Sequence, residues 1–200
     1  MFSKELYQTH LKTKFLGRGM KYLSQTNSTN EDAWKYINDG CETGAIFITD
    51  NQQIGRGRRQ NKWFSSPGKS LTFSFILFPQ TKLDKLGLLP LLTGVSIVQG
   101  IRSFTSIQTG LKWPNDIMLN QKKIGGILTE SRSNSNGLAV VVGIGLNINE
   151  TDADIPDFLK NHATSLTIHS GKQYIREQIL SVILSEFETL YTDSWGSIIP

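Results

Sequence analysis

The chain has 200 residues, which is long enough for one sizeable domain with a hydrophobic core and short for two. Hydrophobic residues make up 38% of it and charged residues 19%, and this composition excludes an intrinsically disordered chain. The formal net charge of +4 suits an anionic ligand or partner but does not identify one.

The single cysteine, Cys41, cannot form an internal disulfide, which favours a reducing compartment. Residues 1–15 lack the apolar run of a signal peptide, and no later run approaches the apolar length of a membrane span. We therefore expect a cytoplasmic protein that does not bind a membrane, and we interpret Cys41 as an incidental thiol.

The first predicted element is a short helix within residues 27–40, NSTNEDAWKYINDG. Ser28 stands three residues before Glu31, which is the spacing of a capping box, and Gly40 is suited to end the helix. A strand is predicted next at 44–50, because GAIFITD is rich in β-branched and aromatic residues.

Residues 70–78, SLTFSFILF, predict an inner strand, because alternating apolar residues give way to residues that are apolar on both faces. Residues 86–104 carry apolar side chains at helical spacing, so we predict a helix with Pro90 in its first turn.

Three further strands are predicted at 110–113, 122–132 and 138–148, with a hairpin turn at 133–137 between the last two. A final helix is predicted over 172–191 and should end near Trp195. This order of elements predicts an α+β domain with a largely antiparallel, mixed sheet backed by helices.

The loop at 54–63, IGRGRRQNKW, combines glycines with Arg56, Arg58, Arg59 and Lys62. Glycines let backbone N–H groups converge on an anion, and arginines add donors suited to carboxylate or phosphate. Taken alone, the loop could equally be a solvated turn, a nucleic-acid contact or a cradle for a small phosphate compound.

Two other segments carry candidate chemistry. In KWPND, Pro114 favours an extended Trp113, so Lys112 should be held close to a sheet, although an ordinary turn built on Asn115 and Asp116 would look the same. GIGLNIN, at 143–149, lacks the context and full spacing of a dinucleotide-binding motif.

Five motifs together resemble the catalytic domain of biotin protein ligases. They are STN at 28–30, QQIGRGRRQNKWFSSPGKSL at 52–71, LKWPNDIML at 111–119, KKIGGIL at 122–128 and GIGLNIN at 143–149. The resemblance implies a fold similar to that of class II aminoacyl-tRNA synthetases, with residues 1–200 forming one catalytic domain.

The resemblance also implies a reaction. Biotin and ATP would form biotinyl-5'-AMP, and the biotinyl group would then pass to a lysine of a biotin carboxyl carrier protein, such as that of acetyl-CoA carboxylase or a related carboxylase. Neither step needs an enzyme nucleophile, but both need anions to be aligned and charge on the phosphate to be stabilised.

By motif match, the resemblance assigns the site residues. Lys112, Arg56 and Arg58 would be catalytic. Biotin would be bound by Ser28, Thr29, Asn30, Gln52, Gly55, Arg56, Gly57, Arg58 and Lys112. ATP and the adenylate would be bound by Arg56, Arg58, Trp63, Lys112, Lys123 and Asn147.

Use of ATP implies Mg²⁺, held mainly by phosphates and water because no carboxylate cluster suggests protein ligands. His10, His162 and His169 show no metal-binding spacing.

About 20 residues precede the motifs, so we expect neither a DNA-binding domain nor DNA as a partner, and we expect that the C-terminal β-barrel of many relatives is absent. Either a monomer or a homodimer is compatible with the sequence. The alternative function is a lipoate- or octanoate-protein ligase or transferase of the same architecture.

Overall fold

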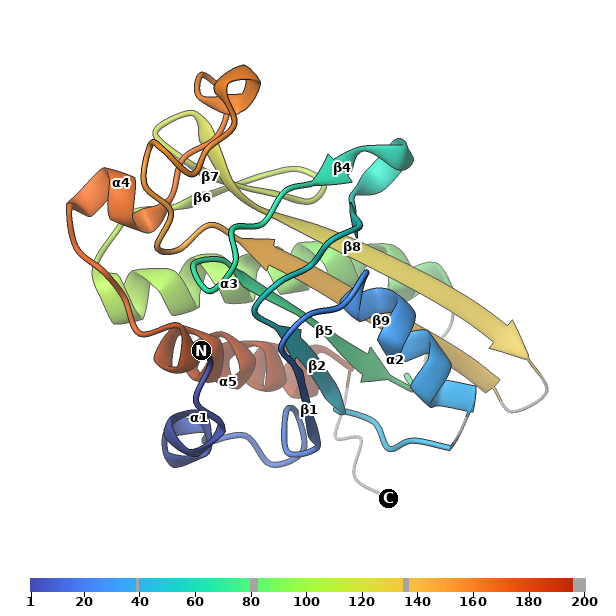
Figure 1. Ribbon diagram of the computed structural model, residues 1–200. Coiled ribbons are helices and arrows are strands. Elements are labelled where there is room, and N and C mark those ends of the chain that lie inside the picture. Colours follow the sequence, from blue (N-terminus) through green and yellow to red (C-terminus); the bar gives the residue numbers. More distant parts are fainter. Residues whose placement is uncertain (39, 80–82, 135–136, 196–200) are drawn as a thin grey trace.

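A computed structural model of the chain describes residues 1–38, 40–79, 83–134 and 137–195 (Figure 1). Its main sheet has seven strands in the order β1-β2-β5-β9-β8-β7-β6, and a separate two-stranded sheet pairs β3 with β4. In the main sheet β1 and β2 are parallel and every other neighbouring pair is antiparallel. The predicted α+β class with a largely antiparallel sheet is confirmed.

The strands are β1 (Met20–Leu23), β2 (Ile46–Thr49), β3 (Gly55–Arg56), β4 (Lys62–Trp63), β5 (Leu71–Leu77), β6 (Gly110–Lys112), β7 (Asp116–Leu119), β8 (Lys122–Asn134) and β9 (Gly137–Leu146). The α-helices are α1 (Lys4–His10), α2 (Thr29–Asn38), α3 (Leu89–Thr105), α4 (Leu166–Ser170) and α5 (Arg176–Trp195). Short 3-10 helices are η1 (Arg58–Gln60), η2 (Leu83–Leu88) and η3 (Asp157–Leu159).

Strand β5 lies inside the sheet between β2 and β9, and all seven of its residues are buried. Its alternate residues Leu71, Phe73 and Phe75 belong to the main hydrophobic core. Successive side chains on a strand point to opposite faces, so Thr72 and Ser74 face the other side of the sheet. The predicted inner strand is confirmed, and its polar positions mark the face that carries the site.

Helices cover the two faces of the sheet unequally (Figure 1). Helices α1, α3 and α5 pack on one face around the main core, whereas α2 packs on the other face in a smaller cluster. Helices α3 and α5 approach closely at Gly100, where a Cβ atom would lie 2.9 Å from Ile183 Cγ1. Part of the face that carries α2 is therefore left to loops, and the candidate site forms there.

One stretch of helix, Leu86–Thr105, is long and apolar enough by length and composition to cross a membrane, with a mean hydropathy of 1.3. This differs from the expectation that no run of the chain approaches the apolar length of a membrane span. Its buried residues Leu89, Ile97 and Ile101 belong to the main core. Of this apolar stretch, 39% is buried inside the fold, where it packs against α5 and the sheet.

The predicted helices correspond to α2, α3 and α5, and Pro90 lies in the first turn of α3 as expected. The predicted hairpin is formed by β8 and β9, although residues 135 and 136 of its turn lie outside the described residues. The elements that were not predicted from the sequence are α1, β1, β3, β4, β7 and α4, of which β3 and β4 fall in the stretch interpreted as a loop. Asp116 was interpreted as a possible turn residue and no element was predicted at 117–119, but residues 116–119 pair with both β6 and β8.

The last helix ties down the beginning of the chain. The carboxylate of Glu188 accepts hydrogen bonds from the backbone N–H groups of Lys14, Phe15 and Leu16, at 2.5, 3.0 and 2.9 Å. Glu177 accepts another from the N–H of Ser3, at 2.6 Å. Bonds to an ionised carboxylate are stronger than neutral ones, so these contacts fix residues 3–16 against α5.

The segment after β9 contains the buried residue Glu150, which is 1% exposed. Burial raises the pKa of this carboxyl to about 7, against the opposing effect of the hydrogen bond that the Ser70 hydroxyl donates to it. The nearby Asp154 has its pKa lowered to about 2, chiefly by the hydrogen bonds that Lys69 Nζ donates to it at 2.6 and 2.7 Å.

Candidate functional site

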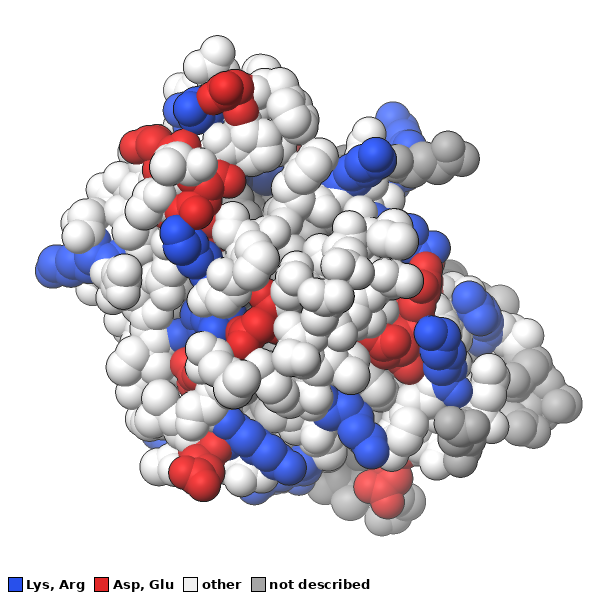
Figure 2. Space-filling view, in the orientation of Figure 1, with Lys and Arg blue, Asp and Glu red and all other residues white. Residues whose placement is uncertain are grey.

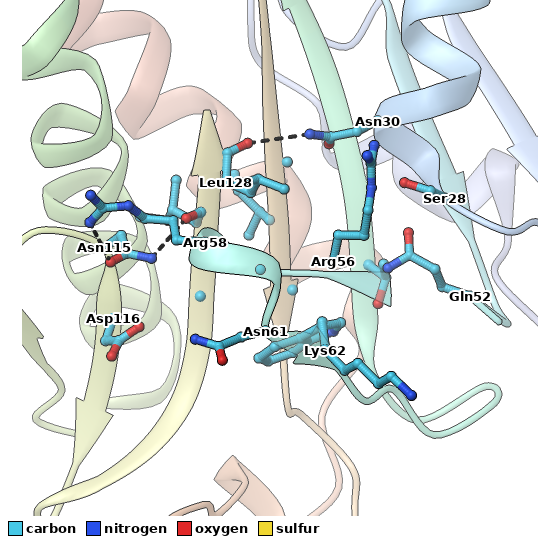
Figure 3. Close-up of a pocket in the computed structure, with 18 of the residues that line it drawn as sticks. Ser28, Asn30, Gln52, Arg56, Arg58, Asn61, Lys62, Asn115, Asp116 and Leu128 are labelled. Atoms are coloured by element: carbon cyan, nitrogen blue, oxygen red, sulfur yellow. Dashed lines mark hydrogen bonds between the residues drawn. The ribbon is translucent and has the colours of Figure 1, made fainter. Parts of the chain in front are cut away.

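A cavity of about 300 Å³ opens on the face of the sheet that carries α2. Its floor is formed by β5, β8 and β9, and the hairpin β3–β4 with its connecting η1 lies over it (Figure 3). Residues predicted to bind ligand that line the cavity are Ser28, Thr29, Asn30, Gln52, Arg56, Gly57, Arg58, Trp63 and Lys123. Segments from widely separated parts of the sequence therefore meet here, as the motifs predict.

Three predicted residues are not among the lining residues: Gly55, Lys112 and Asn147. Gly55 is buried and pairs with Trp63 in the β3–β4 hairpin, where a Cβ atom would lie 2.9 Å from Gln52 Nε2. Its small size thus allows the hairpin to form. Asn147 is also buried, and its side-chain amide donates to the carbonyl of Thr164 at 3.0 Å.

A network of polar side chains forms one end of the cavity. The hydroxyls of Thr29 and Ser74 lie 2.6 Å apart, and Ser74 Oγ also donates to Asn30 Oδ1 at 2.6 Å. Gln52 Oε1 accepts from the N–H of Thr29 at 2.9 Å, so Gln52 satisfies a donor at the start of α2. This network holds α2, β5 and the segment after β2 in register.

Two glycines of β9 make room for the side chains that border the cavity. A Cβ atom on Gly143 would lie 2.9 Å from Asn30 Cγ, and one on Gly145 would lie 2.5 Å from Trp63 Nε1. Real Cβ atoms essentially never come so close to other atoms. Gly143 and Gly145 therefore allow the side chains of Asn30 and Trp63 to approach β9 closely, and they lie in a strand and not in a nucleotide-binding turn.

Arg56 and Arg58 point toward opposite ends of the cavity (Figure 3). Arg56 Nη2 lies 3.6 Å from Glu31 Oε1 and 3.9 Å from Glu130 Oε1, and the side chain is 42% exposed. Glu130 also accepts from Asn30 Nδ2 at 2.8 Å and Trp34 Nε1 at 3.2 Å. Because the ion pairs of Arg56 are long and partly exposed, they contribute little energy and are easily exchanged.

Arg58 connects the basic loop to the hairpin β6–β7. Its Nη1 donates to Asn115 Oδ1 at 3.3 Å, and Asn115 Nδ2 donates to the carbonyl of Ile127 at 3.1 Å. The peptide bond between Trp113 and Pro114, just before Asn115, is cis. Asn115, interpreted from sequence as a turn residue, therefore also links the loop to β8.

Lys123 and Asp116 form an ion pair on the cavity wall, with Nζ and Oδ1 2.6 Å apart. Lys123 Nζ also lies 6.0 Å from the centre of the Trp63 ring, within the range of a cation–π contact. The sequence analysis predicted a role for Lys123 but not for Asp116. Prediction of a strand at 116–119 would have indicated a role for Asp116, because that strand places Asp116 beside β8.

Lys112 is exposed and lies on β6 directly opposite Asp116. Its neighbour Leu111 faces helix α3, because a Cβ atom on Gly94 would lie 3.3 Å from Leu111 Cγ. Side chains alternate along a strand, so Lys112 shares the face of Asp116 and of the cavity. Lys112 thus stands at the edge of the site without lining it.

Arg59 and Lys62, for which the sequence analysis assigned no chemistry, also line the cavity, together with Asn61 and Thr72. Arg59 adopts a left-handed backbone conformation with φ of 54° in the turn of the hairpin. Lys and Arg side chains gather on the projecting end of this hairpin, whereas the rest of the visible face mixes both signs of charge (Figure 2).

Within the described ranges, no group of three or more His, Cys, Asp or Glu side chains is arranged to hold a metal ion. Asp116, the acidic residue on the cavity wall, is paired with Lys123. The residues present do not form a protein cage for a divalent cation, so any cation here would need ligands from a substrate or from water.

Comparison with known proteins gives consistent matches. The model of the biotin/lipoate A/B protein ligase family matches residues 22–147. The bifunctional ligase/repressor BirA of Bacillus spizizenii is 40% identical over 184 residues, covering 92% of this chain and 57% of that protein. BirA of Bacillus subtilis gives the same identity and coverage. The chain therefore spans 57% of the length of these relatives.

Among solved structures, the biotin protein ligase from Aquifex aeolicus in complex with biotin and ATP is similar with a TM-score of 0.79. It is 32% identical to this chain, and the similarity covers 90% of this chain and 73% of that one.

Proposed function

The chain belongs to the biotin/lipoate A/B protein ligase family, and from this premise we propose that it is an ATP-dependent biotin protein ligase. In the proposed reaction a biotin carboxylate oxygen attacks the α-phosphate of ATP, which forms biotinyl-5'-AMP and releases pyrophosphate. The amine of a carrier lysine then attacks the biotinyl carbonyl and displaces AMP. The similarity to the Aquifex aeolicus ligase bound to biotin and ATP favours biotin over lipoate or octanoate.

The observation that carries the proposal is a cavity with two chemically different ends. Thr29, Asn30, Gln52 and Ser74 form a network of uncharged polar groups beside α2, suited to the hydrogen-bonding ring system of biotin, and Arg56 at this end is paired with Glu31 and Glu130. Arg58 and Lys123 lie at the other end, where the carboxylate and phosphates would meet. Such an arrangement aligns two anions that repel each other in solution.

We assign roles to the chain's residues accordingly. Ser28, Thr29, Asn30 and Gln52 bind biotin, and Gly55 and Gly57 let the backbone of the hairpin approach it. Lys112 neutralises the carboxylate and the α-phosphate from the edge of the site. Trp63, Lys123 and Asn147 contribute to the adenylate half, with Asn147 acting from the buried position where it bonds Thr164.

Arg56 and Arg58 would contact both substrates, and this requires them to exchange partners. Arg56 would leave Glu31 and Glu130 for a phosphate or carboxylate, and its long ion pairs make that exchange inexpensive in energy. Closure of the hairpin over the substrates would exclude water and protect the reactive anhydride.

ATP use implies Mg²⁺, which would neutralise the phosphates when bound. We assign it no protein ligands, because the described carboxylates around the cavity do not gather into a metal-binding group.

We propose that residues 1–200 act as one catalytic domain in the cytoplasm, as a monomer or homodimer, with a biotin carboxyl carrier protein as partner. DNA is not proposed as a ligand, since the basic hairpin lines a cavity and does not extend into an open basic stripe on the visible face (Figure 2). Because the Bacillus relatives are named ligase/repressor, DNA binding belongs among the controls.

The test is ATP–pyrophosphate exchange by the purified protein with biotin, lipoate, octanoate or no acid. Exchange with biotin alone is expected, followed by AMP-forming transfer to a carrier domain and not to its Lys→Arg variant. Exchange with lipoate or octanoate alone would replace the proposed substrate, and silence with every acid would refute an adenylating activity. A DNA-binding control should show no saturable complex.

A further inference from the structure

A single arginine joins the two ends of the segment that carries the basic hairpin. Arg176 Nη2 donates to Asp50 Oδ1 at 2.8 Å, and Arg176 Nη1 donates to the carbonyl of Ser70 at 2.9 Å. Asp50 directly follows β2, and Ser70 directly precedes β5. The segment between them, residues 51–69, includes β3, η1 and β4. One side chain therefore holds this segment where it leaves the sheet and where it returns.

The register of the sheet explains why one guanidinium reaches both ends. Strands β2 and β5 are antiparallel neighbours, and Thr49 at the end of β2 pairs with Thr72 near the start of β5. The chain thus leaves and re-enters the sheet at neighbouring positions. The donors of a guanidinium form a rigid, planar fork, so its two bonds also fix the spacing between these positions.

The contact is buried, unlike the hairpin itself. The side chains of Arg176 and Asp50 are 6% and 14% exposed. Burial opposes ionisation of Asp50, but the hydrogen bonds from Tyr22 and Arg176 outweigh it, so the pKa of this carboxyl lies below its usual value. The pair is therefore charged at neutral pH, and removing one partner of a buried pair is strongly destabilising.

Backbone bonds pass this constraint on toward the site. The N–H of Ser66 donates to Ser70 Oγ at 2.8 Å, and the N–H of Gly68 donates to the carbonyl of Asp50 at 2.9 Å. Ser65 Oγ donates to the carbonyl of Gln52 at 3.4 Å. The two ends are thus bonded to each other as far as residue 65, two residues beyond Trp63.

The side-chain contacts of the hairpin arginines are weaker. Arg58 Nη1 reaches Asn115 Oδ1 through one exposed bond of 3.3 Å, and Arg56 Nη2 lies 3.6 Å from Glu31 Oε1. Exposed contacts of this kind contribute little energy. The position of the hairpin over the cavity therefore depends strongly on how the ends of its segment are held.

Resting on the proposed function, we propose that Arg176 is a positioning residue for the ligase reaction. Arg176 is not among the residues that line the cavity, and it begins α5, which packs on the opposite face of the sheet (Figure 1). It acts through the hairpin, because fixing both ends of residues 51–69 sets how Arg56 and Arg58 lie over the substrates. Displacing reacting groups by about 1 Å can lower a rate about 100-fold.

The experiment compares Arg176→Lys and Arg176→Met with Glu188→Gln as the matched control. Arg176→Lys keeps the positive charge beside Asp50 but loses the planar fork, and Arg176→Met removes both bonds. Glu188 is also a buried charged residue of α5 that ties down a distant segment, but its partners are residues 14–16 and not the hairpin.

The first readout is the order of the hairpin in the ligand-free protein, measured by limited digestion with trypsin and location of the cuts by mass spectrometry. Exposed cleavage positions within the hairpin are Arg56, Arg58, Arg59 and Lys62. Cleavage there should become at least about tenfold faster in Arg176→Met, the effect of losing hydrogen bonds to a charged group, and less so in Arg176→Lys. Glu188→Gln should instead increase cleavage at Lys12 and Lys14, which are also exposed.

The second readout is biotin-dependent ATP–pyrophosphate exchange under conditions where urea denaturation shows each protein to be folded. The kcat of Arg176→Met should fall about 10- to 100-fold, and that of Arg176→Lys should lie between Arg176→Met and wild type. Glu188→Gln should stay within about twofold of wild type. If Arg176→Met does not fold, Arg176→Lys carries the test, because it leaves a cation beside the buried Asp50.

Wild-type hairpin cleavage and exchange in a folded Arg176 variant would overturn the inference. A uniform increase in cleavage along the whole chain would also overturn it, since Arg176 would then stabilise the fold in general and not the hairpin. Failure of the proposed function is a separate result: the wild-type protein would show no exchange with biotin, and the cleavage pattern would still decide whether Arg176 orders the hairpin.

Discussion

Asp116 and Lys123 form a 2.6 Å ion pair on the wall of the cavity, although the residue opposite Asp116 across the β6–β7 hairpin is Lys112. Lys123 therefore neutralises Asp116, while Lys112 is exposed at the edge of the same face. Of these two lysines, Lys112 is the one that the proposed function leaves to meet an incoming carboxylate or phosphate.

Lys112→Ala should lower biotin-dependent ATP–pyrophosphate exchange by about 100-fold or more, the typical effect of removing a group that stabilises transition-state charge. The unfolding temperature should not change, because the side chain is exposed. Lys122→Ala is the matched control: Lys122 is a nearby lysine whose Nζ donates to the carbonyl of Lys160 at 2.7 Å. Near-normal turnover by folded Lys112→Ala would refute the assignment.

Arg58→Ala should release biotinyl-5'-AMP about tenfold faster, because it removes the bond to Asn115 that ties the basic hairpin to β6–β7 and a charge facing the adenylate. The release rate can be followed by trapping labelled adenylate after dilution. Arg102→Ala, on the solvent-exposed side of α3, should release it at the wild-type rate. An unchanged release rate for Arg58→Ala would show that the hairpin does not retain the adenylate.

Gly145→Ala should weaken biotin binding by more than about tenfold, because the added methyl group would occupy the space of the Trp63 indole and displace the hairpin. Overpacking of this kind typically costs 1–3 kcal/mol. Gly110→Ala serves as the control, since a Cβ atom there meets no atom within 4 Å. Calorimetric titration of both variants with biotin measures the difference. Equal affinities would show that contact of the indole with the sheet is not needed for binding.

Glu150 should make the stability depend on pH. Its pKa is about 7 in the folded protein and 4.5 as the reference value for an unfolded chain. The folded state therefore binds more protons between these values, so the free energy of unfolding should fall as the pH rises from 4.5 to 7, by at most about 3 kcal/mol.

Glu150→Gln keeps an acceptor for the Ser70 hydroxyl but cannot titrate, so the variant should lose this part of the pH dependence. Urea denaturation of both proteins at pH 5, 6, 7 and 8 tests the difference. Parallel stability curves would mean that Glu150 titrates normally.

Most of the sheet can be predicted from the sequence, because the apolar pattern of most strands lies within the strand itself. Strand β5 and the β8–β9 hairpin carry runs of apolar residues that decide their burial before any contact is known. Strand β7 could not be predicted in this way. Its first residue, Asp116, ends a Pro-Asn-Asp segment typical of a turn, and its four residues become a strand through pairing with β6 and β8 on either side.

The residues of the site also differ in whether the local sequence reveals them or only the pairing of distant segments does. Motifs identified the loop arginines and Lys123, because charge near glycine is visible in the sequence. They did not identify Asp116, whose place on the cavity wall depends on the pairing of β7 with β8. Nor could they place Lys112 at the edge of the cavity, because that position depends on the register of two short strands.

The bonds from Glu188 to residues 14–16 also bear on how the protein is made. Glu188 is 174 residues from Lys14, so this clasp cannot form until nearly the whole described chain has left the ribosome. Until then, three successive backbone N–H groups at the beginning of the chain lack their final acceptor. Residues 3–16 should therefore be among the last to become protected from protease during synthesis, even though they are among the first to be translated.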